Sequence, residues 1–129
     1  MTRILLVDDN EHVRRSMRAV LAGELGQVTI GEARDATEAL ALAGRESWDV
    51  VLLDLSLPDR GGMETLRDIR RLKPAPPVIV MSFHTEAEYT VAARAAGAVG
   101  YVAKGSASGV IAAAIQDALA TTARAIISS

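Results

Sequence analysis

The sequence contains no cysteine. This absence excludes disulfide bonds, thiolate zinc sites and cysteine nucleophiles, and it is compatible with a reducing compartment. Long hydrophobic runs are lacking too. None approaches the roughly 20 residues that span a bilayer, and residues 1–12 reach acidic side chains too early for a signal peptide. We therefore expect a cytoplasmic protein that has no contact with a membrane.

An excess of charge of one sign is also missing. Fourteen Lys and Arg residues face sixteen Asp and Glu residues, which gives a net charge of −2 and indicates no nucleic-acid-binding surface. Half of the 129 residues are hydrophobic and no low-complexity tract occurs, which favours a globular chain over a disordered one. The length suits one domain. We predict that this domain covers residues 1–122, with a C-terminal tail or the start of a linker over 123–129.

Five short apolar segments predict β-strands. One of them, residues 28–33, alternates apolar with polar or small residues, as a strand at the edge of a sheet does. The other four are rich in β-branched residues and too short for helices, which predicts buried strands over 4–7, 50–53, 78–81 and 99–103.

The segments between these strands show helical periodicity. In the first, an apolar stripe is predicted to face the core and consists of Val13, Met17, Val20 and Leu21. Opposite this stripe, Arg14, Arg15 and Arg18 are predicted to face water. Two pairs with capping-box spacing mark the starts of two further helices, Asp35 with Glu38 and Thr85 with Glu88.

Two more helical patterns complete the alternation. One begins near Met63 and stops before Pro74, and the last begins near Val110. Trp48, just before the third strand, is expected to pack against a helix. Strands that alternate with helices predict an α/β fold, in which helices cover both faces of a parallel sheet.

Sites in such folds lie at the carboxyl ends of the strands. Polar side chains follow four of the predicted strands at this end, and they are expected to converge on one edge of the sheet: Asp8, Asp9, Asp54, Ser82, His84 and Lys104. The apolar Phe83 lies between Ser82 and His84 in the sequence.

Three carboxylates gathered at one edge require compensation. At a separation of ~4 Å, each pair repels by roughly 4 kcal/mol at an effective dielectric constant of 20, so the cluster demands a cation or raised pKa values. The ligand atoms are all oxygen, which favours Mg²⁺ over zinc and leaves water positions open for phosphate oxygens. Lys104 and Ser82 can bind phosphoryl oxygens, and a carboxylate beside the metal can attack phosphorus. Asp54 is the best-placed nucleophile because it ends the most central and most apolar strand.

Four segments with these residues resemble the receiver domain of two-component response regulators: "LLVDDN" (5–10), "LLDLSLPDRGG" (52–62), "VIVMS" (78–82) and "GYVAK" (100–104). The resemblance covers essentially the whole chain. Residues 81–115 further resemble receivers that precede a LuxR-type helix-turn-helix output domain. The resemblance implies a flavodoxin-like, doubly wound sheet of five parallel strands in the order 2-1-3-4-5, with five helices.

The resemblance also implies a role for each matched residue. Asp54 is expected to accept a phosphoryl group from a sensor histidine kinase or a phosphotransfer protein. Mg²⁺ is expected to be held by Asp8, Asp9 and Asp54 together with the backbone carbonyl of Ser56.

The remaining matches concern the attached phosphoryl group. Lys104 is expected to pair with it, Ser82 to donate to it, and Tyr101 to turn inward when Ser82 moves. Ser56, Phe83 and His84 occupy positions that tune the lifetime of the phosphate in this family. Phe83 either shields the acyl phosphate from water or packs on the fourth helix. The alanine-rich fourth helix is expected to be the most mobile.

Gly105 departs from the family pattern. A proline in a cis peptide commonly follows the lysine in receivers, whereas Gly105 follows Lys104 here. The loop is therefore either fixed by the permissive backbone of glycine or looser than usual.

Each residue has a simpler explanation when considered alone. Asp8 and Asp9 suit a solvated helix start, Asp54 suits a helix N-cap, and Lys104 suits an exposed surface. His12 is expected to be solvated and His84 to be an exposed loop residue. Four coincident matches favour the phosphoacceptor site over these separate explanations.

Two other functions compete with the phosphorylation switch as explanations of these residues. One is a stand-alone or phosphorylation-independent receiver that acts as an interaction module. A pocket kept only as a structural relic would require the loss of a key residue, and none is lost. Another is a phosphatase, which usually needs a second carboxylate two residues after the nucleophile, where this chain has Ser56. We expect catalysis only of the chain's own phosphorylation and dephosphorylation.

The expected partners follow from the same resemblance. The switch is expected to act through the surface formed by the fourth helix, the fifth strand and the fifth helix, and to control transcription through an output domain absent from this chain. Direct binding of nucleic acid by this domain is not expected. Homodimerisation through small apolar residues of the last helix is a further hypothesis.

Overall fold

A computed structural model describes residues 1–84, 86–106 and 108–128. Its sheet contains five parallel strands in the order β2-β1-β3-β4-β5. The bounds of the strands are β1 Thr2–Val7, β2 Val28–Ala33, β3 Val50–Asp54, β4 Val78–Ser82 and β5 Gly100–Ala103. The predicted fold class and strand order are confirmed, and β2 lies at an edge as the alternation in 28–33 predicts.

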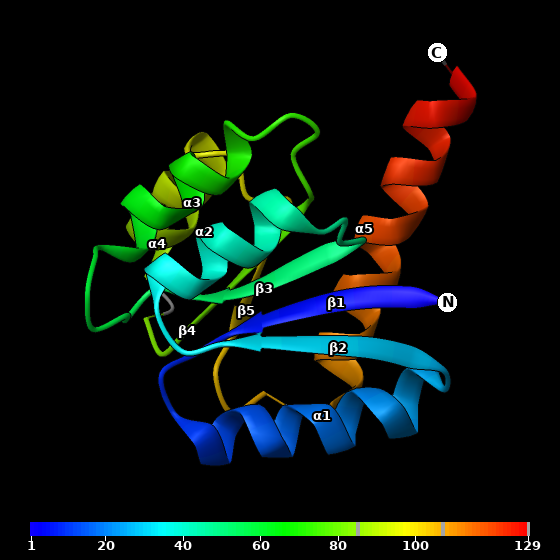
Figure 1. Ribbon diagram of the computed structural model, residues 1–129, viewed down its shortest axis with the longest axis horizontal. Coiled ribbons are helices and arrows are strands. Elements are labelled where there is room, and N and C mark those ends of the chain that lie inside the picture. Colours follow the sequence, from blue (N-terminus) through cyan, green and yellow to red (C-terminus); the bar gives the residue numbers. More distant parts are fainter. Residues whose placement is uncertain (85, 107, 129) are drawn as a thin grey trace.

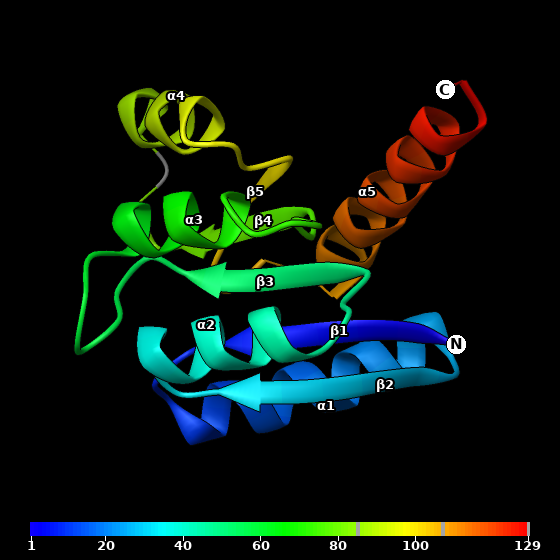
Figure 2. The ribbon, with the colours of Figure 1, turned by 45° about the horizontal axis from the view of Figure 1, so that its top comes forward.

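Helices cover both faces of this sheet (Figure 1; Figure 2). α1 and α5 lie on one face, and α2, α3 and α4 lie on the other. The bounds of the helices in the described residues are α1 Glu11–Leu25, α2 Ala36–Arg45, α3 Gly62–Arg70, α4 Ala87–Ala95 and α5 Ser108–Ser128. No helix in this described part of the chain combines the length and the apolar character needed to traverse a lipid bilayer.

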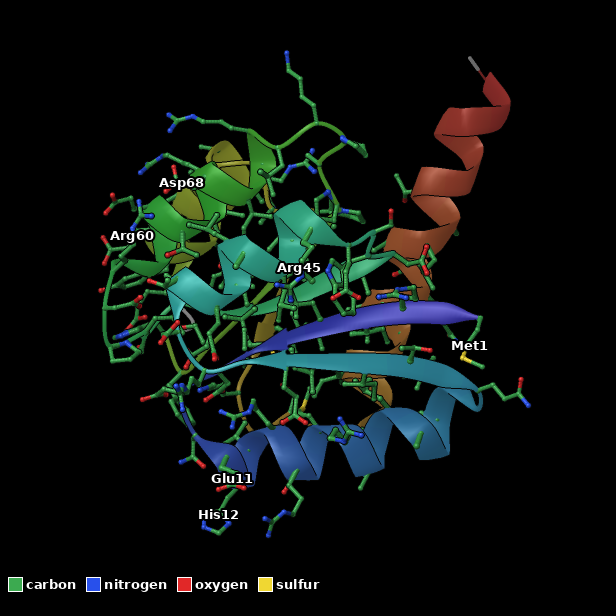
Figure 3. All side chains as sticks on the ribbon, viewed as in Figure 1. Met1, Glu11, His12, Arg45, Arg60 and Asp68 are labelled. Atoms are coloured by element: carbon green, nitrogen blue, oxygen red, sulfur yellow. The ribbon has the colours of Figure 1, made fainter. Side chains whose placement is uncertain are left out.

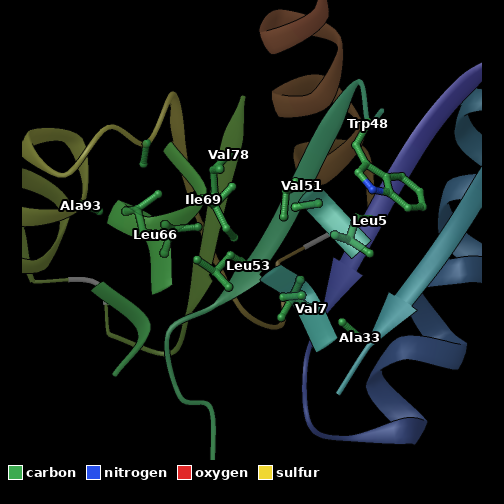
Figure 4. Close-up of a cluster of buried hydrophobic side chains, with 14 residues drawn as sticks. Leu5, Val7, Ala33, Trp48, Val51, Leu53, Leu66, Ile69, Val78 and Ala93 are labelled. Carbon is green, nitrogen blue, oxygen red and sulfur yellow. The ribbon is translucent and has the colours of Figure 1, made fainter. Parts of the chain in front are cut away.

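The period of a β-strand divides the core into two layers. In β1, Ile4 and Leu6 pack toward α1 and α5, whereas Leu5 and Val7 pack toward α2, α3 and α4. Figure 4 shows the second layer, in which Leu66 and Ile69 of α3 pack with alternate residues of β1 and β3. Because both faces are covered, every residue of β3 and β4 is buried. These two strands therefore hold the middle of the sheet rigidly.

The amino terminus of α2 confirms one predicted cap. Asp35 accepts a hydrogen bond from the Glu38 N–H at 2.8 Å. The Glu38 carboxylate accepts from the N–H of Arg34, one residue before the cap, at 2.9 Å. In α4 the N-cap residue is Glu86, whose side chain makes no capping hydrogen bond. Thr85, the cap predicted for that helix, lies outside the described residues.

One prediction about α1 is wrong. Arg14 does not face water, because its side chain is only 14% exposed and pairs with Glu32 of β2 at 2.9 Å. Arg15 and Arg18 are exposed, as predicted, and Met17 and Leu21 are buried. Glu32 is close in space but far in sequence, so helical periodicity alone does not show that Arg14 is largely shielded from water.

α5 continues past the predicted end of the domain. It runs to Ser128, so most of the segment 123–129 that was predicted to be a tail or linker is helical. Its carboxyl-terminal half extends beyond the sheet (Figure 1; Figure 2). The boundary at residue 122 stays a prediction.

Trp48 packs as predicted, and it restricts β2. Its side chain is buried, and its indole N–H donates to the Leu42 carbonyl of α2 at 3.0 Å. The guanidinium of Arg3 lies 4.7 Å from the centre of the ring. A Cβ atom at Gly31 would approach the ring to 2.3 Å. Glycine is therefore required at residue 31 by close packing.

We expect Gly31→Ala to lower the free energy of unfolding by about 1–3 kcal/mol, because the added methyl group forces Trp48 out of its position. Urea titration followed by Trp48 fluorescence measures this change. Gly44→Ala in α2 is the matched control, since its Cβ would meet nothing within 4 Å. That substitution is expected to leave stability unchanged or raise it by up to about 1 kcal/mol. Equal effects of the two substitutions would contradict the packing argument.

Candidate functional site

The carboxyl ends of the strands bring the predicted polar residues to one edge of the sheet. Asp8 and Asp9 follow β1, Asp54 ends β3, Ser82 ends β4 and Lys104 follows β5. β3 lies between β1 and β4, so the side chain of Asp54 has neighbours on both sides. This arrangement follows from parallel strands, whose carboxyl ends all meet at the same edge.

Three carboxylates form the centre of this edge. One carboxylate oxygen from each of Asp8, Asp9 and Asp54 lies within 4.8 Å of the others. Asp8 is 1% exposed and Asp54 is 2% exposed, whereas Asp9 is exposed. The predicted convergence of the acidic residues is therefore seen in the structure.

Lys104 bridges the two buried carboxylates. Its Nζ lies 2.8 Å from Oδ2 of Asp8 and 2.9 Å from Oδ2 of Asp54. Burial opposes the charge of Lys104, but hydrogen bonds to both carboxylates outweigh it and raise the pKa of the amine. Burial raises the pKa of the Asp54 carboxyl, although the Ser56 N–H and Lys104 act in the opposite direction. One ammonium does not balance three carboxylates, so the cluster keeps an excess of negative charge.

The oxygen atoms of this cluster fit a hard divalent cation. Oδ2 of Asp8 is buried, and the Lys104 ammonium lies 2.8 Å from it. The other oxygen, Oδ1, accepts from the Asn10 N–H at 2.9 Å. Three clustered carboxylates that share a single ammonium keep negative charge to spare, which suits the oxygen preference of Mg²⁺. The residues present therefore fit the metal that the sequence predicts.

A tight turn sets the position of Lys104. Gly105 has φ = 86°, a left-handed conformation that favours glycine. The N–H and hydroxyl groups of Ser106 both donate to the carbonyl of Ala103, at 3.1 Å and 2.6 Å. The N–H of Lys104 donates to the Ser82 carbonyl at 2.8 Å. Gly105 thus adopts the permissive backbone conformation that the first of the two alternatives for this loop requires.

Ser82 and Tyr101 meet at the backbone of His84. The buried Ser82 hydroxyl oxygen accepts from the His84 N–H at 3.0 Å. Tyr101 donates its phenolic proton to the His84 carbonyl at 2.6 Å. The His84 ring stacks on Tyr89 of α4, with ring centroids 4.5 Å apart. A continuous set of contacts thus joins the end of β4 to α4 and β5.

Phe83 lies over the cationic side of the site. Its side chain is 78% exposed, and the Nζ of Lys104 lies 5.3 Å from the centre of its ring. Both roles predicted for Phe83, shielding of the acyl phosphate and packing on the fourth helix, stay predictions. His84 is exposed, as predicted for a loop residue. His12 is also exposed and projects away from α1 (Figure 3).

Ser56 follows Asp54 by two residues. Its N–H donates to Oδ1 of Asp54 at 3.0 Å, and it forms an isolated antiparallel bridge with Gly61. Both contacts hold the start of the loop between β3 and α3 against the acidic cluster.

Two supporting residues near Asp8 were missed from the sequence. Arg14 donates to the Asp8 carbonyl at 2.6 Å, and it also pairs with Glu32 of β2. The side chain of Asn10 caps α1 by accepting from the Val13 N–H at 3.1 Å. Asn10 before a helical pattern is a recognisable cap signal. No local signal identifies Arg14, because its partner Glu32 lies on another element.

Comparison with known proteins agrees with this geometry. The family model of the response regulator receiver domain matches residues 4–116. The chain belongs to the response regulator receiver domain family. The response regulator UvrY of Escherichia coli (strain K12) is 38% identical over 107 residues, which are 83% of this chain and 49% of UvrY. The chain thus spans about half the length of the curated relatives it matches.

Solved structures of receivers superpose closely. A LuxR-family two-component response regulator from Aurantimonas sp. SI85-9A1 has a TM-score of 0.86 and 37% identity, covering 94% of this chain and 87% of that chain. A response regulator from Burkholderia pseudomallei, solved with a phosphorylated aspartic acid, a calcium ion and citrate, has a TM-score of 0.81 and 27% identity, covering 100% of this chain and 75% of that chain. The predicted membership in two-component signalling is confirmed, as is the similarity to LuxR-type regulators.

The raised pKa of Asp54 predicts how stability depends on pH. The carboxyl group ionises at a lower pH in the unfolded chain than in the folded receiver, so the stability it contributes below its unfolded pKa is lost as pH rises through the folded pKa. In the presence of a chelator, we expect Asp54→Asn to be more stable than the wild type at pH 7. We also expect the difference to grow as pH rises through the folded pKa.

Urea unfolding at several pH values measures this difference. Asp117→Asn, on the exposed side of α5, controls for a change of charge outside the cluster. If Asp54→Asn is no more stable than the wild type at pH 7, burial of the ionised Asp54 carboxylate does not destabilise the folded protein.

Proposed function

We propose that Asp54 accepts a phosphoryl group from a sensor histidine kinase or a phosphotransfer protein. The observation that carries this proposal is the buried Asp54 carboxylate, whose Oδ2 lies 2.9 Å from Lys104 Nζ and which clusters with Asp8 and Asp9. Membership in the receiver family supports it. The cytoplasm, where such kinases present their phosphohistidine, is the location that we propose.

The transfer is a displacement at phosphorus. A carboxylate oxygen of Asp54 attacks phosphorus, the bond between phosphorus and the donor histidine nitrogen breaks, and the electron pair of that bond returns to the imidazole. The product is an acyl phosphate, and no oxidation occurs. Lys104 is placed to pair with the oxygens of the incoming phosphoryl group. Later attack of water on phosphorus releases phosphate and restores the carboxylate, so the chain catalyses only its own phosphorylation and dephosphorylation.

We propose that Asp8, Asp9, Asp54 and the backbone carbonyl of Ser56 hold Mg²⁺. When bound, the metal supplies positive charge for the cluster and for the phosphoryl oxygens. The response regulator from Burkholderia pseudomallei, solved with a phosphorylated aspartic acid and a calcium ion, supports phosphorylation of Asp54 and the binding of a divalent cation.

Phosphorylation is expected to act on the contacts of Ser82. The phosphoryl group adds about two negative charges and three strong acceptors. The Ser82 hydroxyl oxygen is already an acceptor of the His84 N–H, so its proton is available for a phosphoryl oxygen. Movement of Ser82 would disturb the backbone of His84, whose carbonyl accepts the hydrogen bond from Tyr101. We propose that this shared backbone passes the change to the surface of α4, β5 and α5.

The weak packing of α4 suits a surface that changes between two conformations. Ala93 is its buried residue, whereas Val91 is 67% exposed. A helix that buries so little side-chain volume is held weakly, so its predicted mobility is consistent with the packing. We propose that Ser56, Phe83 and His84 tune the lifetime of the phosphate. Similarity to LuxR-family regulators supports an output in transcription through a further domain. Homodimerisation through small apolar residues of α5 is a further part of the proposal.

Incubation with Mg²⁺ and acetyl phosphate, followed by intact mass, tests the assignment. We expect the wild type to gain one phosphoryl group and Asp54→Asn to gain none. Lys104→Met is expected to slow the reaction on the order of 100-fold, because one charged group that stabilises the transferring phosphoryl is lost. Arg71→Met, on the exposed end of α3, is the matched control and is expected to react like the wild type. A phosphoryl adduct on Asp54→Asn, or none on the wild type, would contradict the proposal.

A further inference from the structure

The loop between β3 and α3 is attached to a helix outside the phosphoacceptor site. This loop, residues 55–61, carries Ser56 and passes near the amino terminus of α2 (Figure 1; Figure 2). Asp59 of the loop makes the contact with α2. The Asp59 carboxylate accepts from the Ala36 N–H at 2.9 Å, from the Thr37 N–H at 3.1 Å and from the Thr37 hydroxyl at 2.9 Å. These donors belong to the first two residues of α2.

Two carboxylates thus cap one helix terminus. Asp35 accepts from the N–H of Glu38. Asp59 accepts from the N–H groups of Ala36 and Thr37, the two residues before Glu38. The backbone N–H of Ala36 is the main cause that holds the pKa of Asp59 below its ordinary value, so the carboxylate stays ionised. The two caps differ in one respect. Asp35 adjoins α2 in sequence, whereas Asp59 joins α2 to a different segment.

The loop has other contacts as well, at its ends and through two of its side chains. Leu57 packs against the apolar core, and Arg60 pairs with Glu64 and Asp68 of α3. The Leu55 N–H donates to the Met81 carbonyl at 3.4 Å, and Ser56 pairs with Gly61. A Cβ atom at Gly62 would lie 2.3 Å from the Leu55 carbonyl oxygen, so α3 begins in close contact with the end of β3. The arc from residue 57 to residue 60 has Asp59 as its connection to α2. Asp59 thus ties the loop that carries Ser56 to α2, in addition to the contacts that Ser56 itself makes with Asp54 and Gly61.

We propose that Asp59 is a positioning residue, which anchors the loop to α2 and so directs the Ser56 carbonyl toward the cluster of Asp8, Asp9 and Asp54. This inference rests on the proposed function, because it takes the Ser56 carbonyl as a metal ligand. It links the amino terminus of α2 to the metal affinity of a site to which α2 contributes no ligand.

Asp35→Ala and Asp59→Ala form a matched pair for the test. Each removes one carboxylate cap from the same helix terminus, so both are expected to lower the urea midpoint to a similar extent. Only Asp59→Ala releases the loop. Titration of the unphosphorylated protein with Mg²⁺, followed by the amide NMR shifts of Asp9, Asp54 and Ser56, measures the Kd. We expect Asp59→Ala to raise the Kd by about tenfold or more, and Asp35→Ala to change it by less than about twofold.

Asp59→Asn separates the anchor from the charge. Asparagine removes the negative charge but keeps a carbonyl oxygen that accepts from helix N–H groups. We expect its Kd to stay within about threefold of the wild type. Equal Kd values for Asp35→Ala and Asp59→Ala would overturn the proposal, as would an Asp59→Asn variant that binds as weakly as Asp59→Ala. A wild type without any Mg²⁺-dependent shift would instead refute the proposed function itself, and the anchor with it.

Discussion

Two buried carboxylates that share one ammonium are the interaction on which the phosphoacceptor site depends. Asp8 and Asp54 are almost wholly removed from solvent, and Lys104 lies within 2.9 Å of an oxygen of each. Burial of an unpaired carboxylate is strongly unfavourable, so neither group is tolerable at this position without a cation. The lysine compensates only part of the charge. The remaining negative charge favours the binding of a divalent cation. A bound divalent cation would in turn attract the oxygens of a phosphate group.

The sheet makes this arrangement possible because its strands differ in what they contribute. β1 and β3 are adjacent and supply the carboxylates, whereas Lys104 follows β5 and reaches past the end of β4. The Lys104 N–H donates to the Ser82 carbonyl of β4, so the backbones of the lysine and the serine are held side by side. His84, whose backbone contacts both Ser82 and Tyr101, connects this pair to α4. A charge placed on Asp54 therefore acts on groups that already touch the proposed output surface.

Much of this was predictable from the sequence, for a physical reason. Strands buried on both faces are short apolar runs, and parallel strands end at one edge, so the convergence of Asp8, Asp54 and Lys104 follows from two simple rules. Contacts between polar residues of different elements were not predictable. Arg14 was placed toward water because helical periodicity does not reveal Glu32 on the neighbouring strand. Asp59 gave no signal either, since a polar loop residue that caps a distant helix looks like any solvated aspartate.

A crystal structure of the protein with Mg²⁺ and beryllofluoride, a mimic of the phosphoryl group, tests the central claim most directly. The account predicts beryllofluoride on a carboxylate oxygen of Asp54, Mg²⁺ bound by Asp8, Asp9, Asp54 and the Ser56 carbonyl, and the adduct in contact with Lys104 and Ser82. Beryllofluoride on another side chain, or a metal bound without these carboxylates, would contradict it.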